Sequence, residues 1–95
     1  MGATVGLLHL KLYVGQAMNL KDKRRVIKSF KDRLANKFNV SVAEVDGQNN
    51  HRSVVLAVAM VSNDKKYIDG AFQKIVNSAS VNRNMTLVDY ETHWL

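Results

Sequence analysis

The sequence predicts an α+β protein with a ferredoxin-like βαββαβ fold, in which a four-stranded antiparallel sheet carries two helices on one face. Two segments have helical spacing of apolar residues, four have strand patterning, and their order is strand, helix, strand, strand, helix, strand. The 95 residues suffice for one domain, residues 1–95, because a second domain could not bury a core of its own. This architecture places the first and third strands in the middle of the sheet.

The first strand is predicted over residues 4–14, where a Leu-rich face alternates with a mixed face. The Leu-rich face, expected in the core, consists of Gly6, Leu8, Leu10, Leu12 and Val14. The other face carries Val5, Leu7, His9, Lys11 and Tyr13.

The first helix is predicted over Leu20 to Phe38, because five apolar residues recur there at helical spacing. They are Leu20, Ile27, Phe30, Leu34 and Phe38. Asn19 and Asp22 resemble a capping box at the start of this helix, with Asp in place of the usual Glu.

The second strand is predicted over 40–46, followed by a polar loop and a third strand over 53–61. Both rows of the third strand are apolar, so the sequence does not determine which row faces outward. Glu44 and Asp46 lie two apart and are expected on one face of the edge strand, as edge charges or as salt-bridge partners of Arg52.

The second helix is predicted after an N-cap among Ser62, Asn63 and Asp64, since apolar residues then recur at helical spacing up to Ala79. The last strand is predicted over 85–95. Its expected common face consists of Thr86, Val88, Tyr90, Thr92 and Trp94.

The positive charge is concentrated on the first helix. Its eight Lys or Arg residues and two Asp give a formal charge of +6, which equals the net charge of the chain. Five of the cations fall within a sector of about 120° beside the apolar residues, and we call them the basic ridge: Lys21, Arg24, Arg25, Lys28 and Lys31. The basic ridge could bind the phosphates of RNA, including ribosomal RNA; the alternative is a face that is only solvated.

The outward face of the predicted sheet is too apolar to be left in water. The third strand has no aromatic residue on which bases could stack, as they do in RNA-recognition motifs, so RNA contact is expected at the helix. The apolar face instead predicts a homodimer, with interface residues Val5, Leu7, Tyr13 and Val55. A protein-interaction module without a role in nucleic-acid binding is therefore a second interpretation.

The sequence offers no catalytic residue, metal site or cofactor site, and predicts a protein that is not an enzyme. The chain has no cysteine, and its three histidines lack the spacing of metal ligands. Acylphosphatases share the order of elements, but the loop Gly15–Met18 lacks the arginine that they need after the first strand. A small-ligand sensor of the ACT type stays open as a third interpretation.

The segment at 1–10 lacks the features of a signal peptide, and no window reaches the roughly 18 apolar residues of a membrane span. We therefore expect a cytoplasmic protein without a membrane partner.

Three segments resemble the YlxP-like family of small bacterial proteins. They are LKDKRRVIKSFKDRLANKFNVSVAEVD from Leu20, VSND from Val61, and LVDYE from Leu87. The resemblance covers nearly the whole chain, although the loop Gly47–His51 lacks the bulkier and aromatic residues frequent in the family. It implies a ferredoxin-like fold in a cytoplasmic bacterial protein, and a connection with RNA or the ribosome, since family genes often neighbour those of transcription and translation factors. The family has no established activity that the resemblance would carry over to this chain.

Overall fold

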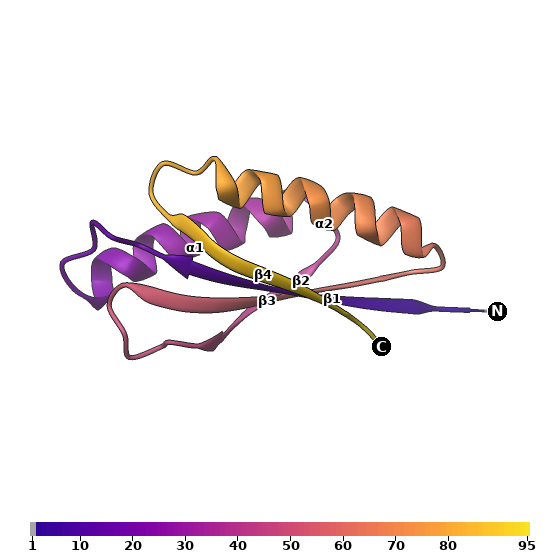
Figure 1. Ribbon diagram of the computed structural model, residues 1–95, viewed down its shortest axis with the longest axis horizontal. Coiled ribbons are helices and arrows are strands. Elements are labelled where there is room, and N and C mark those ends of the chain that lie inside the picture. The colour runs from indigo at the N-terminus through magenta and orange to yellow at the C-terminus, as the bar shows by residue number, and fades with distance from the viewer. Residues whose placement is uncertain (1) are drawn as a thin grey trace.

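The computed structural model describes residues 2–95 and has the predicted order of elements (Figure 1). The elements are β1 (Thr4–Tyr13), α1 (Leu20–Lys37), β2 (Ser41–Asp46), β3 (Ser53–Ser62), α2 (Lys65–Ser80) and β4 (Thr86–Trp94). Both helices begin where the sequence predicts. Asn19 accepts a hydrogen bond from the backbone N–H of Asp22, and Asp64 accepts one from that of Lys66.

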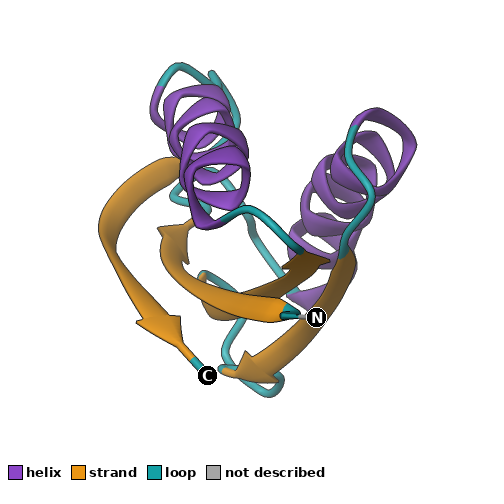
Figure 2. Ribbon diagram, turned by 90° about the vertical axis from the view of Figure 1, so that its right-hand side faces the viewer, coloured by secondary structure: helices purple, strands orange, loops and turns teal. Residues whose placement is uncertain are grey.

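The strands form one antiparallel sheet in the order β2-β3-β1-β4, so β1 and β3 occupy the middle as predicted. Both helices lie on the same face of the sheet, and within residues 2–95 no helix or strand lies over the opposite face (Figure 2). We call these the covered face and the open face. The predicted ferredoxin-like fold is confirmed.

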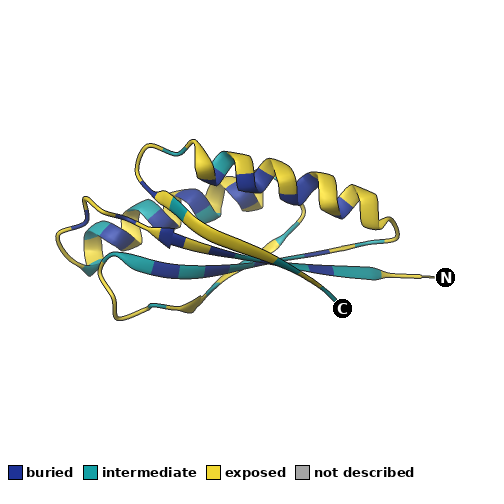
Figure 3. Ribbon diagram, viewed as in Figure 1, coloured by how far each residue is buried: buried dark blue, intermediate teal, exposed yellow. Residues whose placement is uncertain are grey.

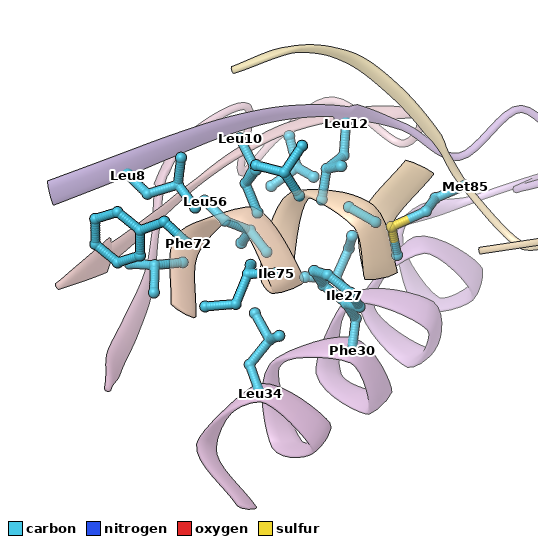
Figure 4. Packing of buried hydrophobic residues seen from close by; sticks show 14 of the residues in the cluster. Leu8, Leu10, Leu12, Ile27, Phe30, Leu34, Leu56, Phe72, Ile75 and Met85 are labelled. Carbon is cyan, nitrogen blue, oxygen red and sulfur yellow. The ribbon is translucent and has the colours of Figure 1, made fainter. Parts of the chain in front are cut away.

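The core lies between the covered face and the helices (Figures 3 and 4). Leu8, Leu10 and Leu12 of β1 are fully buried there, as their alternation predicts. The helices add side chains at helical spacing, including Ile27 and Phe30 from α1.

The pairing of β1 with β3 decides which row of β3 faces outward. Leu8 lies opposite Val58 and Leu10 opposite Leu56, and these β3 residues are buried with their partners. The other row therefore belongs to the open face: Ser53, Val55, Ala57, Ala59 and Val61.

Both edge strands contain an irregularity in register, and each one overturns a prediction of a common face. In β2, Glu44 pairs with Leu56 and Asp46 pairs with Val55, so the two carboxylates lie on opposite faces. Neither of the ion pairs among residues 2–95 involves Arg52, so the predicted salt bridge from Arg52 is also wrong.

In β4, the irregularity falls at Val88 and separates two parts of the strand. Thr86 pairs with Tyr13 on the open face, whereas Tyr90 pairs with Leu10 on the covered face. The prediction that Thr86 shares a face with the later residues of β4 is therefore wrong. The prediction is confirmed for Tyr90, Thr92 and Trp94, which pair with Leu10, Leu8 and Gly6. A bulge adds one residue to a strand, which sequence alternation alone does not reveal.

Trp94 packs against the second helix. Its ring is stacked on that of Phe72 at 6.3 Å between centroids, and the Lys65 ammonium lies 4.7 Å above the indole. Neither helix within residues 2–95 combines the length and apolar content needed to cross a lipid bilayer.

Candidate nucleic-acid interface

The basic ridge is presented by α1, whose start is fixed by reciprocal hydrogen bonds. The Asp22 N–H donates to Asn19 Oδ1 at 2.9 Å, and Asp22 Oδ2 accepts from the Met18 N–H at 2.9 Å. In the usual capping box this side chain accepts from the N–H of the N-cap residue. Here Asp22 accepts instead from the N–H of Met18, the residue before the N-cap Asn19. Its negative charge also lies in the first turn, where it stabilises the helix dipole.

The structure places the five predicted residues of the basic ridge along one side of α1. Lys21, Arg24, Arg25 and Lys28 are exposed, whereas Lys31 is half-buried. The side of α1 towards α2 is marked by different cations, because Arg33 and Lys37 line the groove between the helices. At 100° per residue the basic ridge lies across the apolar side chains from that groove, so it faces away from α2.

One residue of the basic ridge is paired. Lys28 Nζ lies 2.7 Å from Asp32 Oδ2, one turn further along the helix. The hydrogen bond and the charge of Asp32 raise the pKa of Lys28 above its ordinary value. Within the part of the chain described, the ammonium and guanidinium groups of the other four make no ion pair.

Lys23 is one of the eight cations predicted on α1, but its side chain is completely buried, at 0% exposure. Its ammonium donates to the carbonyl oxygens of Gly47 at 2.7 Å and Ser53 at 3.3 Å. The signal was present in the spacing, because Lys23 follows Leu20 by three and precedes Ile27 by four. It therefore lies in the middle of the apolar side of the helix.

Lys23 joins the start of α1 to the hairpin between β2 and β3. Gly47 has φ +83, a conformation that side chains disfavour, and a Cβ there would lie 2.6 Å from the Ser53 carbonyl oxygen. Arg52, at the other end of the loop, donates from Nε to the carbonyl of Ala17 at 3.2 Å. These bonds hold the hairpin against the loop that precedes α1, and so fix the end of the molecule at which the basic ridge begins.

The structure places all four predicted interface residues, Val5, Leu7, Tyr13 and Val55, on the open face. They do not form one continuous apolar surface, because His9 and Lys11 separate Leu7 from Tyr13 along β1. The apolar part of the face is completed by residues that the sequence could not assign to it, and we call the whole set the open-face patch: Val5, Leu7, Val55, Ala57, Ala59 and Val61.

Beside the open-face patch lies a polar hollow of about 350 Å³. It is lined by His9, Lys11, Val55, Asp89, Tyr90, Glu91 and His93. The His9 and His93 rings meet edge to face at 5.3 Å, and His93 Nε2 lies 3.3 Å from Glu91 Oε1. Within residues 2–95 no group of three or more His, Asp or Glu side chains is placed to hold a metal ion.

These features define a small ferredoxin-like α+β domain with a cation-rich helix and an uncovered, partly apolar sheet face. The chain belongs to a family of proteins of unknown function, DUF503, whose model matches residues 5–92. This agrees with the resemblance seen in the sequence.

Two similar proteins support the family and the fold. The uncharacterized protein YlxP of Bacillus subtilis (strain 168) is 29% identical over 72 residues, which cover 76% of this chain and 78% of that protein. The de novo designed protein Foldit4 has a similar structure, with a TM-score of 0.57 and 17% identity over 99% of this chain and 97% of that one. The second likeness concerns the fold alone.

Proposed function

We propose that this protein is a non-enzymatic RNA- or ribosome-associated factor of the cytoplasm, and that it binds phosphates through the basic ridge. The observation that carries the proposal is the set of four cations on one side of α1 that make no ion pair within residues 2–95: Lys21, Arg24, Arg25 and Lys31. Free cations aligned on a rigid element are available to replace the counterions of a phosphate backbone. Lys28, though paired with Asp32, is exposed and can exchange partners.

The dimensions and anchoring of α1 support this use. Ten residues separate Lys21 from Lys31, which is roughly 15 Å along a helix and long enough to follow several phosphates. The buried Lys23 and the cap at Asn19 hold the first turns in place. A ridge that is already ordered loses less conformational entropy when it binds.

The open face supports RNA contact at the helix and not on the sheet. RNA-recognition motifs stack bases on aromatic side chains of the two central strands. Here the central positions of β3 are Val55, Ala57 and Ala59, which give bases no aromatic surface, and β1 adds only Tyr13 near its end and the imidazole of His9.

The open face favours a second proposal, that two copies of this chain pair through it. Both edge strands have irregular register, which disfavours edge-to-edge pairing and favours face-to-face packing. The open face also carries both signs of charge, with Lys11 beside Asp89 and Glu91. A two-fold axis can therefore bring opposite charges together around the apolar open-face patch.

The test of RNA binding is a salt series with ribosomal RNA fragments. The test variant changes Lys21, Arg24, Lys28 and Lys31 to Gln. The matched control changes Lys65, Lys66, Lys74 and Arg83 to Gln, which removes the same charge from exposed positions outside the basic ridge and the open face. Four or five phosphate contacts predict that log affinity falls with log salt at a slope of roughly −3 to −4.5 for the wild type. The test variant should lose most of this slope and the control should keep it; equal binding by both variants would contradict the proposal.

The test of dimer formation is light scattering at micromolar concentration. The wild type should give twice the mass of the chain, and Leu7→Lys or Val55→Lys should give a folded monomer. A wild type that is monomeric throughout would contradict the dimer, and would favour the small-ligand interpretation of the open face.

A further inference from the structure

A groove between α1 and α2 forms a second cationic surface, separate from the basic ridge. It has a volume of about 630 Å³ and lies between the C-terminal halves of the helices. Its lining residues are Arg33, Leu34, Lys37 and Phe38 of α1 and its C-cap, and Lys74, Asn77, Ser78 and Val81 of α2 and its C-cap. We call it the interhelix groove.

The interhelix groove exists because the two helices approach different parts of the sheet. α2 packs over β1, β3 and β4, whereas α1 approaches β2 at the edge of the sheet. Viewed along the sheet, the two helices diverge from each other (Figure 2). Their facing sides therefore meet no third element in the part of the chain that the structure describes.

The charge of the interhelix groove has one sign. Arg33, Lys37 and Lys74 line it, and no Asp or Glu is among its lining residues. None of these three cations takes part in an ion pair within residues 2–95, although the Arg33 guanidinium lies 5.8 Å from the centre of the Phe30 ring. An anionic partner would meet no repulsion from carboxylates at this surface.

The interhelix groove also offers apolar contacts. Leu34 is buried at its base, Phe38 is half-buried, and Val81 is 77% exposed at the end of α2. Asn77 and Ser78 provide polar groups on the same side of α2 as Val81. The surface is thus apolar along its base and cationic at its margins.

We propose that the interhelix groove binds an acidic amphipathic helix of a partner protein. Such a helix would lay its Leu-like side chains on Leu34, Phe38 and Val81, and its carboxylates would meet Arg33, Lys37 and Lys74. A nucleic-acid strand would use the cations but would leave Val81 in water. A small anion would fill only part of a groove of this size and would remain open to solvent.

This proposal does not rest on RNA binding, because the two surfaces lie on different sides of α1. Arg33 and Lys37 face α2, whereas Lys21, Arg24 and Lys28 face away from it. One protein could therefore hold RNA on the basic ridge and a protein partner in the interhelix groove at the same time. Such an arrangement would connect an RNA to a second protein.

The experiment uses a panel of synthetic acidic helices as probes. Each peptide has about 16 residues, with Leu at positions i, i+3, i+4 and i+7 and Glu at the flanking positions, and the peptides differ in Leu register. Binding to the ¹⁵N-labelled full chain is followed by NMR. The expected result is saturable shifts confined to the amides around Leu34, Phe38, Asn77 and Val81 with at least one register.

Two variants and a matched control identify the surface that binds. Changing Arg33, Lys37 and Lys74 to Glu should weaken peptide binding by about tenfold or more, and Val81→Asp should weaken it several-fold. Changing Lys65, Lys66 and Arg83 to Glu alters the net charge equally at exposed positions outside the groove, the basic ridge and the open face, and should leave affinity within about twofold.

Four results would overturn the proposal. One is the absence of saturable shifts with every peptide up to about 1 mM. The second is an equal loss of affinity in the control variant, which would show attraction by net charge alone. The third is equal binding of a peptide whose Leu residues are replaced by Ser. The fourth is a single-stranded RNA that shifts the groove amides at lower concentration than any peptide, which would assign the groove to nucleic acid.

Discussion

Leu7 and Leu8 are neighbours in the chain, yet they lie on opposite faces of the sheet and in different environments. Leu8 is 0% exposed under the helices, whereas Leu7 is half-buried on the open face. On the covered face, β1 from Leu8 to Leu12 and β3 from Val54 to Met60 contribute Leu, Val and Met side chains that are all buried. The open face of the same strands includes Ala57, Ala59 and the ionisable His9.

The packing of side chains on the covered face stabilises the fold, whereas the open face is available for contacts with other molecules. On the covered face each side chain is closely packed against others, so a change in side-chain volume lowers the stability of the fold. On the open face the same alternation leaves apolar and charged groups that no other part of residues 2–95 covers. Matched substitutions on the two faces should therefore differ in their effect on the free energy of unfolding.

The largest effect is expected from truncating one of two adjacent leucines. Leu8→Ala should lower the free energy of unfolding by about 2–5 kcal/mol because it leaves a cavity in the core. Leu7→Ala should lower it by about 1 kcal/mol or less when measured at a concentration that disfavours dimers. Urea denaturation of both variants measures the difference, and equal losses would contradict the division into two faces.

A smaller effect is expected at Lys23, the one charged side chain buried among residues 2–95. Lys23→Ala should cost about 2–3 kcal/mol of unfolding free energy, because it removes a packed stem and leaves the carbonyls of Gly47 and Ser53 without their donor. Lys23→Met keeps the stem and should cost about 1–2 kcal/mol. The exposed Lys21→Ala is the control, expected within about 0.5 kcal/mol of the wild type; a similar result for Lys23→Ala would exclude the anchoring role.

Opposite signs are expected from the same change at two glycines. A Cβ on Gly6 would lie 2.7 Å from Ile68 Cγ2 and 2.9 Å from Phe72 Cε2, so Gly6→Ala should destabilise the protein by about 1–2 kcal/mol. A Cβ on Gly70, inside α2, would meet no atom of residues 2–95 within 4 Å apart from its chain neighbours and the backbone of its own helix, so Gly70→Ala should stabilise the protein by about 0.5–1 kcal/mol. Thermal unfolding measures the sign of each change in stability. Stabilisation by Gly6→Ala would contradict the prediction and show that the core has space for a methyl group there.

The smallest effect is expected at the exposed pair of Lys28 and Asp32. Asp32→Asn should return the pKa of Lys28 towards its ordinary value, because the partner that raises it is lost. A raised pKa means that the stabilisation from this pair is present below the ordinary pKa of Lys and lost as pH rises through the raised one. NMR titration of the Lys28 side chain between about pH 9 and 12 measures the shift, and an unchanged pKa in Asp32→Asn would contradict the pairing.

Much of the fold could be predicted because two periodicities are strong. The alternation in β1 assigned Leu8, Leu10 and Leu12 to the core, and the spacing of Ile27, Phe30 and Leu34 assigned the inner side of α1. The basic ridge followed from the same helical geometry. Alternation failed in β2 and β4, where an irregular register moves residues to the other face.

The sequence by itself determined the order of elements, the covered face of β1 and the concentration of positive charge on the first helix, because these depend on local periodicity and composition. Only the tertiary structure decided that Val55 faces outward, that Lys23 is buried against the hairpin, and that three cations share a groove between the helices. Each of these depends on which residues from distant segments meet. That is set by strand register and helix placement, which no local pattern contains.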